Sequence, residues 1–244
     1  MIPSHPLISK VPALADWDLD ILFKSIKHIY FRIYPEKRLI RISAPKRVNR
    51  RELDRVIQGK LPWLEAQVRR LENRRQQAVS TPTPFQYTTG EVHTVAGVSH
   101  ALRRVHGRAG VELSSDGELI LSAPDGIDTA GLAKILEHWH RRDLLDRARE
   151  MVTHWEPVMG VQVNELRIRR MKTRWGSCNI RVGRIWLNLA LAHAHPQLLE
   201  YVVVHEMVHL LEAGHNRRFY GFMDRFLPSW RVSKDQLNRQ VLLR

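Results

Sequence analysis

The chain has 244 residues, enough for one large domain or two small ones with a buried core. Its 43% hydrophobic and 26% charged residues are ordinary for a soluble globular protein. With 39 basic and 25 acidic residues the formal net charge is +14. Such a charge suits contact with nucleic acid or another polyanion, and a generally basic, soluble surface is the alternative that it favours more. No zinc-finger, P-loop or RNP-type signature is present, so polyanion binding would supplement another activity rather than replace it.

Cys178 is the single cysteine of the chain, which excludes an internal disulfide framework and fits a reducing compartment. The N-terminus lacks a charged segment followed by an apolar one, and no run approaches the ~18 apolar residues of a membrane span. The sequence therefore predicts a cytoplasmic protein that does not cross a membrane. It does not indicate an oligomeric state.

Residues 1–24 have the composition of an irregular leader with a short helical stretch. Residues 25–75 begin with two alternating apolar runs around Pro35, a pattern that predicts a β-hairpin. Asn49 is a suitable N-cap for a helix, and a second helix is expected to start near Pro62. We therefore expect an N-terminal region made of a hairpin and two helices.

Residues 76–84 (QQAVSTPTP) have linker composition, small and polar with two prolines. Residues 85–126 contain short apolar runs separated by turn signals and are expected to form a β-rich meander, with a hairpin over 113–121 around an Asp-Gly turn. Ser43-Ala44-Pro45 and Ser122-Ala123-Pro124 each follow a predicted hairpin and precede a predicted helix. This echo suggests a repeated β-β-α unit.

Residues 127–244 carry longer periodic segments. Asp128 is positioned to cap a long helix that ends near Gly160. Residues 162–169 and 180–192 alternate as strands, and further helices follow. The whole chain therefore reads as an α+β protein.

The most informative window of the sequence is Val202–Phe219, VVVHEMVHLLEAGHNRRF. His205 and His209 are four residues apart, so on a helix they lie on one face and can bind the same tetrahedral Zn²⁺. Glu206 follows the first of them and can reach the water that such a metal activates. His215 comes after a glycine that can end the helix, and it would complete a three-histidine site with an open fourth position.

A chance origin of this motif is a weak alternative. An H-E-x-x-H pattern would arise about 0.04 times in a chain of this composition, and the third histidine lowers that figure further. The helix that carries the motif is apolar and fit for burial, and unpartnered histidine and glutamate side chains are costly to bury. The window therefore predicts a zinc hydrolase rather than surface histidines.

Other residues near the motif have less specific interpretations. His193 and His195 lie just before the metal helix, but three ligands are already present, so neither is expected to bind the metal. Cys178 lacks a local base that would favour a thiolate and is expected to be a small buried residue. A zincin-type site also needs a free strand edge for its peptide, and Ile185–Leu191 is the candidate.

With these residues in view, the sequence resembles the YgjP-like metallopeptidase family, whose members are described as metal-dependent hydrolases and are related to SprT-like proteases. The resemblance covers most of the chain from about residue 25 and is most specific in its C-terminal half. Four blocks carry it: RIRRMKTRWGSC (167–178), IWLNLAL (185–191), YVVVHEMVHLLEAGHNRRFY (201–220) and LPSWR (227–231).

The resemblance implies a zincin-like catalytic core over residues 127–244, with Glu206 as general base and His205, His209 and His215 as zinc ligands. It also implies that the loop 174–178 lies near the metal helix. A metzincin is excluded, because that family has glycine at the position of Glu212 and a Met-turn that is not visible here.

Three functions remain open from the sequence. The first is a metallopeptidase that cleaves a polypeptide substrate. The second is a zinc-dependent nucleotide phosphohydrolase, which the many basic residues would suit. The third is a non-catalytic polyanion-binding protein with a structural zinc. The group that would stabilise an oxyanion is also open, and four residues are candidates: Tyr201, Tyr220, Arg174 and Arg217.

Overall fold

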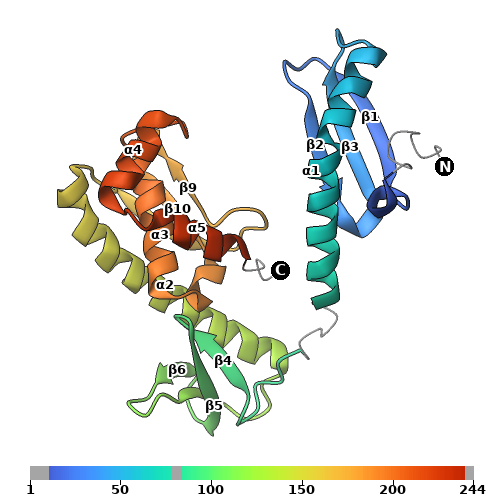
Figure 1. Cartoon of the computed structure of the whole chain (residues 1–244). Helices are drawn as coiled ribbons and strands as arrows, with labels where there is room; N and C mark the ends of the chain where they lie inside the picture. Colours follow the sequence, from blue (N-terminus) through green and yellow to red (C-terminus); the bar gives the residue numbers. More distant parts are fainter. Residues whose placement is uncertain (1–10, 78–83, 240–244) are drawn as a thin grey trace. The chain divides into compact units, whose positions relative to one another are not determined.

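The structure, a computed structural model, describes residues 11–77 and 84–239. The chain is mixed α/β and divides into two compact units, Met1–Thr83 and Pro84–Arg244 (Figure 1). No helix among the described residues is both long enough and apolar enough to cross a membrane. Each unit has a hydrophobic core of its own, and the second unit has two.

The described residues form five α-helices and ten β-strands. The helices are α1 Arg50–Gln77, α2 Thr129–Met159, α3 Pro196–Val208, α4 Arg217–Phe226 and α5 Trp230–Arg239. The strands are β1 Asp18–Lys24, β2 Tyr30–Tyr34, β3 Leu39–Pro45, β4 Val92–Val95, β5 Val98–His106, β6 Gly110–Leu113, β7 Leu119–Ala123, β8 Glu165–Arg169, β9 Gly176–Asn179 and β10 Arg184–Asn188. Four 3₁₀ turns are η1 Pro12–Leu14, η2 Pro35–Lys37, η3 Ile180–Val182 and η4 Leu189–His193.

One strand arrangement occurs three times. The sheets have the orders β1-β3-β2, β4-β5-β7-β6 and β8-β10-β9. In each, the last of three consecutive strands lies between the other two, parallel to the first and antiparallel to the second. An α-helix follows each time, α1, α2 and α3 in turn. The chain therefore contains three β-β-β-α repeats of one topology, and β4 is added to the edge of the sheet in the second repeat.

The repeat suggested by the two Ser-Ala-Pro segments is supported and extended. Ser43 pairs with Leu22 of the parallel neighbour strand, and Ser122 occupies the equivalent place opposite Val105. The predicted meander over 85–126 is wrong, because β5 pairs with β7 in parallel rather than with β6. Local turn signals revealed the β6–β7 hairpin but not this longer connection.

The predicted leader, 1–24, is also corrected where the structure describes it, and its first ten residues lie outside the described part. Asp18–Lys24 is a strand that pairs with β3 along its full length, and Leu14 and Trp17 before it are buried. The partner of this strand lies about twenty residues further along the chain, so no hairpin signal marks it. The predicted hairpin is confirmed as β2 and β3, which pair antiparallel from Tyr30 to Tyr34.

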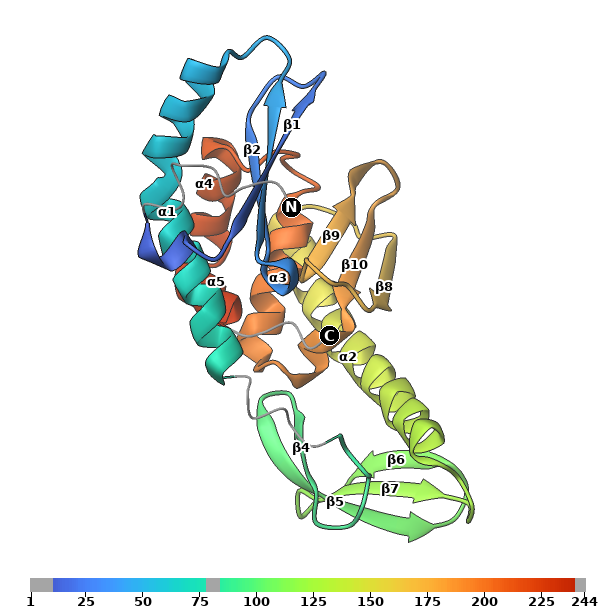
Figure 2. The same ribbon diagram turned by 90° about the vertical axis from the view of Figure 1, so that its right-hand side faces the viewer.

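A single helix, α1, replaces the two that were predicted, and it passes through Pro62 (Figure 2). Asn49 caps its start as expected, since its Oδ1 accepts from the Glu52 amide at 2.9 Å. The apolar face is continuous across the proline, with Ile57 and Leu64 both fully buried against the sheet. This packing outweighs the local cost of proline inside a helix.

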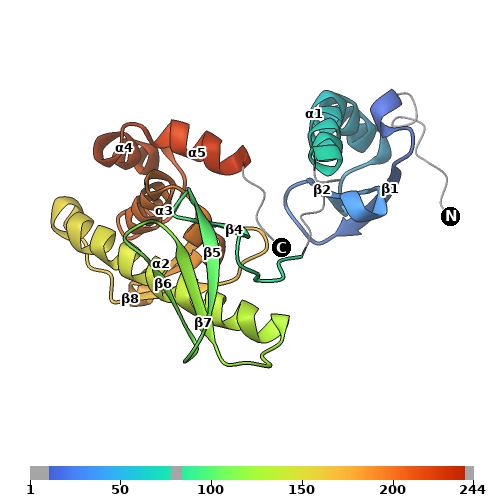
Figure 3. The ribbon, with the colours of Figure 1, turned by 90° about the horizontal axis from the view of Figure 1, so that it is seen from below.

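The long helix α2 connects the two cores of the second unit (Figure 3). As predicted, it begins at Asp128, whose Oδ1 accepts from the Gly131 amide at 2.8 Å, and ends at Gly160 with φ 66°. Its first turns bury Leu132 and Leu136 against the β4–β7 sheet, and its later turns pack against α3 and β8. One rigid element therefore joins the sheet to the segment that carries the histidine motif.

The β4–β5 turn fixes the same sheet to the start of α3. The Ala96 amide donates to the Ala192 carbonyl at 2.9 Å and the Gly97 amide to the His193 carbonyl at 3.1 Å. A Cβ on Gly97 would lie 2.9 Å from the His195 Cα, so glycine is required by this approach as well as by its φ of 82°. Residues 85–126 and 127–244 accordingly lie in one compact unit.

The predicted linker, 76–84, falls partly outside the described residues. Its first two residues, Gln76 and Gln77, end helix α1, and residues 78–83 are not described. The division between the two compact units lies at its far end, between Thr83 and Pro84.

A buried histidine cluster lies where α2 meets the β4–η4 contact. His140 of α2 is 5% exposed, its ring centroid is 4.7 Å from that of His193, and its Nδ1 has no hydrogen-bond partner among the described residues. Burial, and after it the neighbouring His193, His93 and Arg147, lower the pKa of His140 to about 3. The neutral imidazole is therefore the form that this site accommodates.

This cluster predicts an acid-sensitive fold. The pKa of His140 in the folded protein lies below the ordinary value of 6.5, so between these two values the unfolded chain binds more protons than the folded one. The contribution of His140 to the free energy of unfolding is therefore fully present above pH 6.5 and is lost as the pH drops toward 3. In His140→Leu we expect the free energy of unfolding to fall less between pH 6.5 and pH 4 than in the wild type, by at most about 3 kcal/mol, as measured by urea unfolding at each pH. The matched control is His138→Leu, an exposed position on the same helix. Equal pH slopes in the wild type and His140→Leu would contradict the assignment.

Candidate metal centre

Helix α3 places His205 and Glu206 inside the second unit. It begins at Pro196, and nine of its 13 residues are buried, while His205 is half-buried. The helix ends at Val208, so His209 is its C-cap, yet the backbone there is still helical at φ −62°. The rings of His205 and His209 consequently lie next to each other on one face of the helix, edge to face, with centroids 5.1 Å apart.

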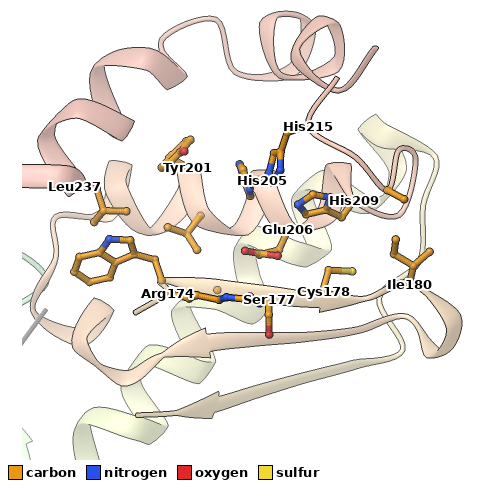
Figure 4. A pocket seen from close by; sticks show the side chains of 14 residues that line it. Arg174, Ser177, Cys178, Ile180, Tyr201, His205, Glu206, His209, His215 and Leu237 are labelled. Carbon is orange, nitrogen blue, oxygen red and sulfur yellow. Dashed lines mark hydrogen bonds between the residues drawn. The ribbon is translucent and has the colours of Figure 1, made fainter. Parts of the chain in front are cut away.

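His215 is brought to the same place by the turn after α3. Asn216 caps α4 by accepting from the Arg218 and Phe219 amides at 2.9 and 3.1 Å, and this cap fixes the residue before it. The His215 Nε2 lies 3.0 Å from the His205 Nε2. Each of the three histidines offers a nitrogen, and these nitrogens all lie within 4.8 Å of one another. The three rings converge above α3 (Figure 4).

The geometry of the three imidazoles fits a tetrahedral metal ion. Zn–N bonds of about 2.0–2.1 Å place two ligand nitrogens about 3.3 Å apart, close to the separation of the His205 and His215 Nε2 atoms. The His209 Nδ1 lies 3.2 Å from the Glu212 carbonyl oxygen, and donation there leaves Nε2 with a free lone pair. Burial, then the nearby His209, His215 and Lys234, lowers the pKa of His205 to about 3, which keeps that ring neutral.

Phe219 forms the floor under the three rings. Its side chain is fully buried, and its ring centroid lies 5.0, 4.8 and 4.6 Å from those of His205, His209 and His215. The sequence pattern did not single this residue out, because a phenylalanine at helical spacing reads as core. Its position on the first turn of α4 gives the cluster an apolar support that limits ring movement.

Glu206 lies beside the histidine cluster and is not part of it. Its side chain is directed from α3 toward β9 (Figure 4), and the residue is 6% exposed. Burial raises the pKa of its carboxyl group to about 8, against the opposing effect of the positive charge on Arg174. A cation held by the three imidazoles would lower this pKa, because nearby positive charge favours the carboxylate.

Gly176 makes room for this carboxyl group. A Cβ built there would lie 2.6 Å from the Glu206 Oε1 and 2.8 Å from its Cγ. The residue needs no unusual backbone angle, so only the close approach of Glu206 requires glycine. The first residue of β9 is thus shaped around the side chain of a residue thirty positions away.

A cavity of about 510 Å³ opens between α3 and β9. The lining residues come from these two elements, from the loops beside them and from α5: Arg174, Trp175, Gly176, Ser177, Cys178, Ile180, Tyr201, Val202, His205, Glu206, His209, Ala213, His215 and Leu237. Glu206 is the only carboxylate among them. The loop 174–178 therefore lies next to the histidine cluster, as the resemblance implied.

The strand predicted to hold a peptide is the wrong one. β10 is the central strand of its sheet, paired with β8 on one side and with β9 on the other, so it has no free edge. The edge strand that faces the cavity is β9. Strand order within a sheet is a long-range property, and the alternation of apolar residues in β10 carried no information on it.

Asn188, at the end of β10, is a structural residue that the sequence analysis passed over. It is 2% exposed, and its side-chain Nδ2 donates to the Met171 and Arg174 carbonyls, each at 2.8 Å. Its backbone N–H donates to the Trp175 carbonyl at 2.8 Å. These bonds hold the loop that leads into β9. An asparagine directly after the apolar run Ile185–Leu187 was the available signal, since a buried amide needs partners.

The remaining candidates are placed away from the reacting centre or in supporting roles. His193 contacts the Thr94 carbonyl through Nδ1 at 2.6 Å, and His195 caps α3, so neither joins the cluster. Cys178 lines the cavity half-buried, but burial, reinforced by Glu206, raises the pKa of its thiol to about 11. The thiol therefore stays protonated, which argues against a nucleophilic role.

Two of the four candidates for oxyanion stabilisation line the cavity and two do not. Tyr201 and Arg174 line it, and Tyr220 and Arg217 are not among its lining residues. Tyr201 lies one turn before His205 on the same face of α3, with ring centroids 5.8 Å apart. Burial, and then Glu206, raises the pKa of Tyr201 to about 12, so its hydroxyl remains a hydrogen-bond donor.

Two solved structures are similar in part: the metallopeptidase zymogen abylysin of Pyrococcus abyssi, at 19% identity and a TM-score of 0.36, and the zymogen jannalysin of Methanocaldococcus jannaschii, at 16% and 0.33. They cover 39% and 37% of this chain and 99% and 96% of their own. A search of curated proteins found no match.

The family comparison covers most of the chain. The sequence matches the family described as "YgjP-like, metallopeptidase domain" over residues 27–240, which cover most of both compact units and the whole histidine motif. The protein belongs to the YgjP-like metallopeptidase family.

Proposed function

We propose that this protein is a zinc-dependent peptidase in which His205, His209 and His215 hold the metal and Glu206 is the general base. The observation that carries the proposal is the convergence of three imidazole nitrogens beside a buried carboxyl group that is not itself in the cluster. We further assign the α3–β9 core to the zincin-like class and the polypeptide substrate to the cavity between these elements.

Zinc at such a site supplies Lewis-acid chemistry, polarising a carbonyl group and making a water molecule more acidic. The residues of the chain do the rest. Glu206 accepts the proton of the attacking water and later delivers it to the leaving amine. It can do so because a cation held by the three histidines would lower the raised pKa of this buried carboxyl group and favour the carboxylate. Gly176 lets that carboxyl group approach the backbone of β9, where the substrate would lie.

The free edge of β9 favours a peptide over other substrates. An exposed strand edge offers unpaired amide and carbonyl groups that can bind an extended chain, with side-chain pockets giving selectivity. β9 has this edge and lines the cavity from Gly176 to Cys178. A substrate paired there would pass directly over Glu206 and the three histidines.

Tyr201 is our candidate for stabilising the oxyanion that forms as the carbonyl is attacked. It lines the cavity on the same helix face as His205, and its hydroxyl remains protonated. Preorganised donors of this kind act on the charge that develops in the transition state.

Two variants, Glu206→Gln and His209→Ala, test separately the role of Glu206 as general base and that of His209 as metal ligand. We expect Glu206→Gln to retain stoichiometric zinc and lose at least about 100-fold in kcat, because it keeps the shape and removes the base. His209→Ala should lose the zinc itself on dialysis. The measurements are metal content by atomic absorption and cleavage of an unfolded protein, with nucleoside triphosphates offered in parallel.

The outcomes of that experiment distinguish the functions. Peptide cleavage that disappears in Glu206→Gln supports the proposal. Phosphate release that disappears instead would assign the site to nucleotide hydrolysis. A fully active Glu206→Gln enzyme would refute the choice of base, and zinc retained by His209→Ala would refute the ligand set.

Gly176→Ala tests the position of Glu206. The added methyl group would overlap the carboxyl group, so we expect a loss of kcat of at least about tenfold and a destabilisation of about 1–3 kcal/mol, with zinc content unchanged. Gly221→Ala on α4 is the control, because no atom lies within 4 Å of its added Cβ. Unchanged activity in Gly176→Ala would show that the placement of Glu206 is not needed.

Tyr201→Phe tests the oxyanion role. The substitution keeps the ring that packs on Trp230, with centroids 6.5 Å apart, and removes only the hydroxyl. We expect kcat to fall by about 10²-fold for every peptide, with little change in KM, because the donor acts on the transition state. A change in KM alone would assign Tyr201 to substrate binding.

A further inference from the structure

The loop before β9 carries a concentration of positive charge next to the cavity. It forms a hollow of about 410 Å³ whose lining residues are consecutive: Arg169, Arg170, Met171, Lys172, Thr173 and Arg174. No carboxylate is among them. Arg174 lines this hollow and also the larger cavity that contains the histidines. The two spaces are therefore adjacent, and Arg174 stands between them.

The cations of this loop differ in how far they are already paired. Arg170 is bound to Glu137 at 2.7 Å, and the guanidinium of Arg169 lies 4.8 Å from the centroid of the Trp186 ring. Lys172 and Arg174 are exposed, and neither forms an ion pair within residues 11–77 and 84–239. These two side chains are consequently available to an incoming anion.

The backbone of the loop is fixed even though its charged side chains are exposed. The buried Asn188 side chain binds the Met171 and Arg174 carbonyls and accepts from the Met171 amide at 3.3 Å. The carbonyl of Trp175 accepts from the Asn188 amide. Both sides of the Lys172–Arg174 segment are thus held to β10. A charged group on a fixed backbone loses less conformational freedom on binding than one on a free loop.

We propose that Arg174, with Lys172 beside it, forms a subsite for a carboxylate of the peptide substrate. This proposal rests on the proposed function, because it assumes a peptide paired along β9. A peptide that extends past Gly176 reaches Arg174 next, so a group at that end of the peptide meets a cation. Arg174 is suited to this role because guanidinium binds carboxylate through two parallel hydrogen bonds.

The direction of β9 relates the subsite to the polarity of the substrate. β9 runs from Gly176 to Asn179, away from Arg174. A substrate antiparallel to it reaches Arg174 with the residues that follow the cleaved bond, and the carboxylate is then an acidic side chain or the C-terminus. A parallel substrate arrives with the residues before the bond, where only an acidic side chain is available. The two sources of the carboxylate can therefore be tested separately.

The experiment compares peptides that differ only in the anionic group. A neutral parent peptide is compared with versions that carry glutamate on either side of the cleaved bond, and with free-acid and amidated C-termini. The enzymes are the zinc-loaded wild type, Lys172→Gln/Arg174→Gln and the control Lys134→Gln, an exposed lysine on α2. For one acidic placement we expect kcat/KM to exceed that of the neutral peptide by about tenfold in the wild type and in the control. The preference should disappear in the double variant.

A binding measurement keeps this test separate from the test of catalysis. Dissociation constants of the same peptides are measured with Glu206→Gln, alone and combined with the two glutamine substitutions. Tighter binding of acidic peptides that is lost in the combined variant supports the subsite, even if no peptide is cleaved. Equal binding of acidic and neutral peptides, or a preference that survives the substitutions, overturns it. Displacement of the acidic peptide by nucleoside triphosphate at lower concentration also overturns it, in favour of a phosphate ligand.

Discussion

The close packing of the Glu206 side chain on the backbone of Gly176 is the contact on which the site depends. It fixes the distance between helix α3 and edge strand β9, and so sets the width of the cavity between them. Burial of the carboxyl group raises its pKa. The position of the proposed base thus depends on the absence of a side chain at residue 176.

The parts of the site that could be predicted from the sequence were those that depend on residues only a few positions apart in the chain. Two histidines four apart on a helix, with a glutamate after the first, define a helical face, and the structure brings the third histidine to the same point. The ends of α2 were equally local, since Asp128 and Gly160 act within one turn of themselves. Local geometry is what a single sequence specifies most directly.

The features that were missed depend on contacts between distant segments. The strand β1 pairs with a partner beyond a hairpin, and β10 is enclosed by two neighbours. Helix α1 continues through Pro62 because buried residues before and after the proline pack in the same core. Gly176 and Asn188 belong to the same class. Each has an ordinary local conformation, and its importance comes from a side chain or carbonyl brought to it by the fold.

The three repeats differ in how far the helix that follows their strands is covered. In the first two repeats, the helix that follows the strands (α1 and α2) is long, 28 and 31 residues, and keeps an exposed polar face. In the third it has 13 residues and is covered on nearly every side by α2, α4, α5 and the sheet. A polar group on a covered helix cannot rely on bulk water, so it needs a partner supplied by the protein or by a ligand. Glu206 on α3 is such a group, and so is His140 on α2. Glu206 lies next to the cluster of three imidazoles, so a cation bound there, as we propose, would have a structural as well as a chemical role.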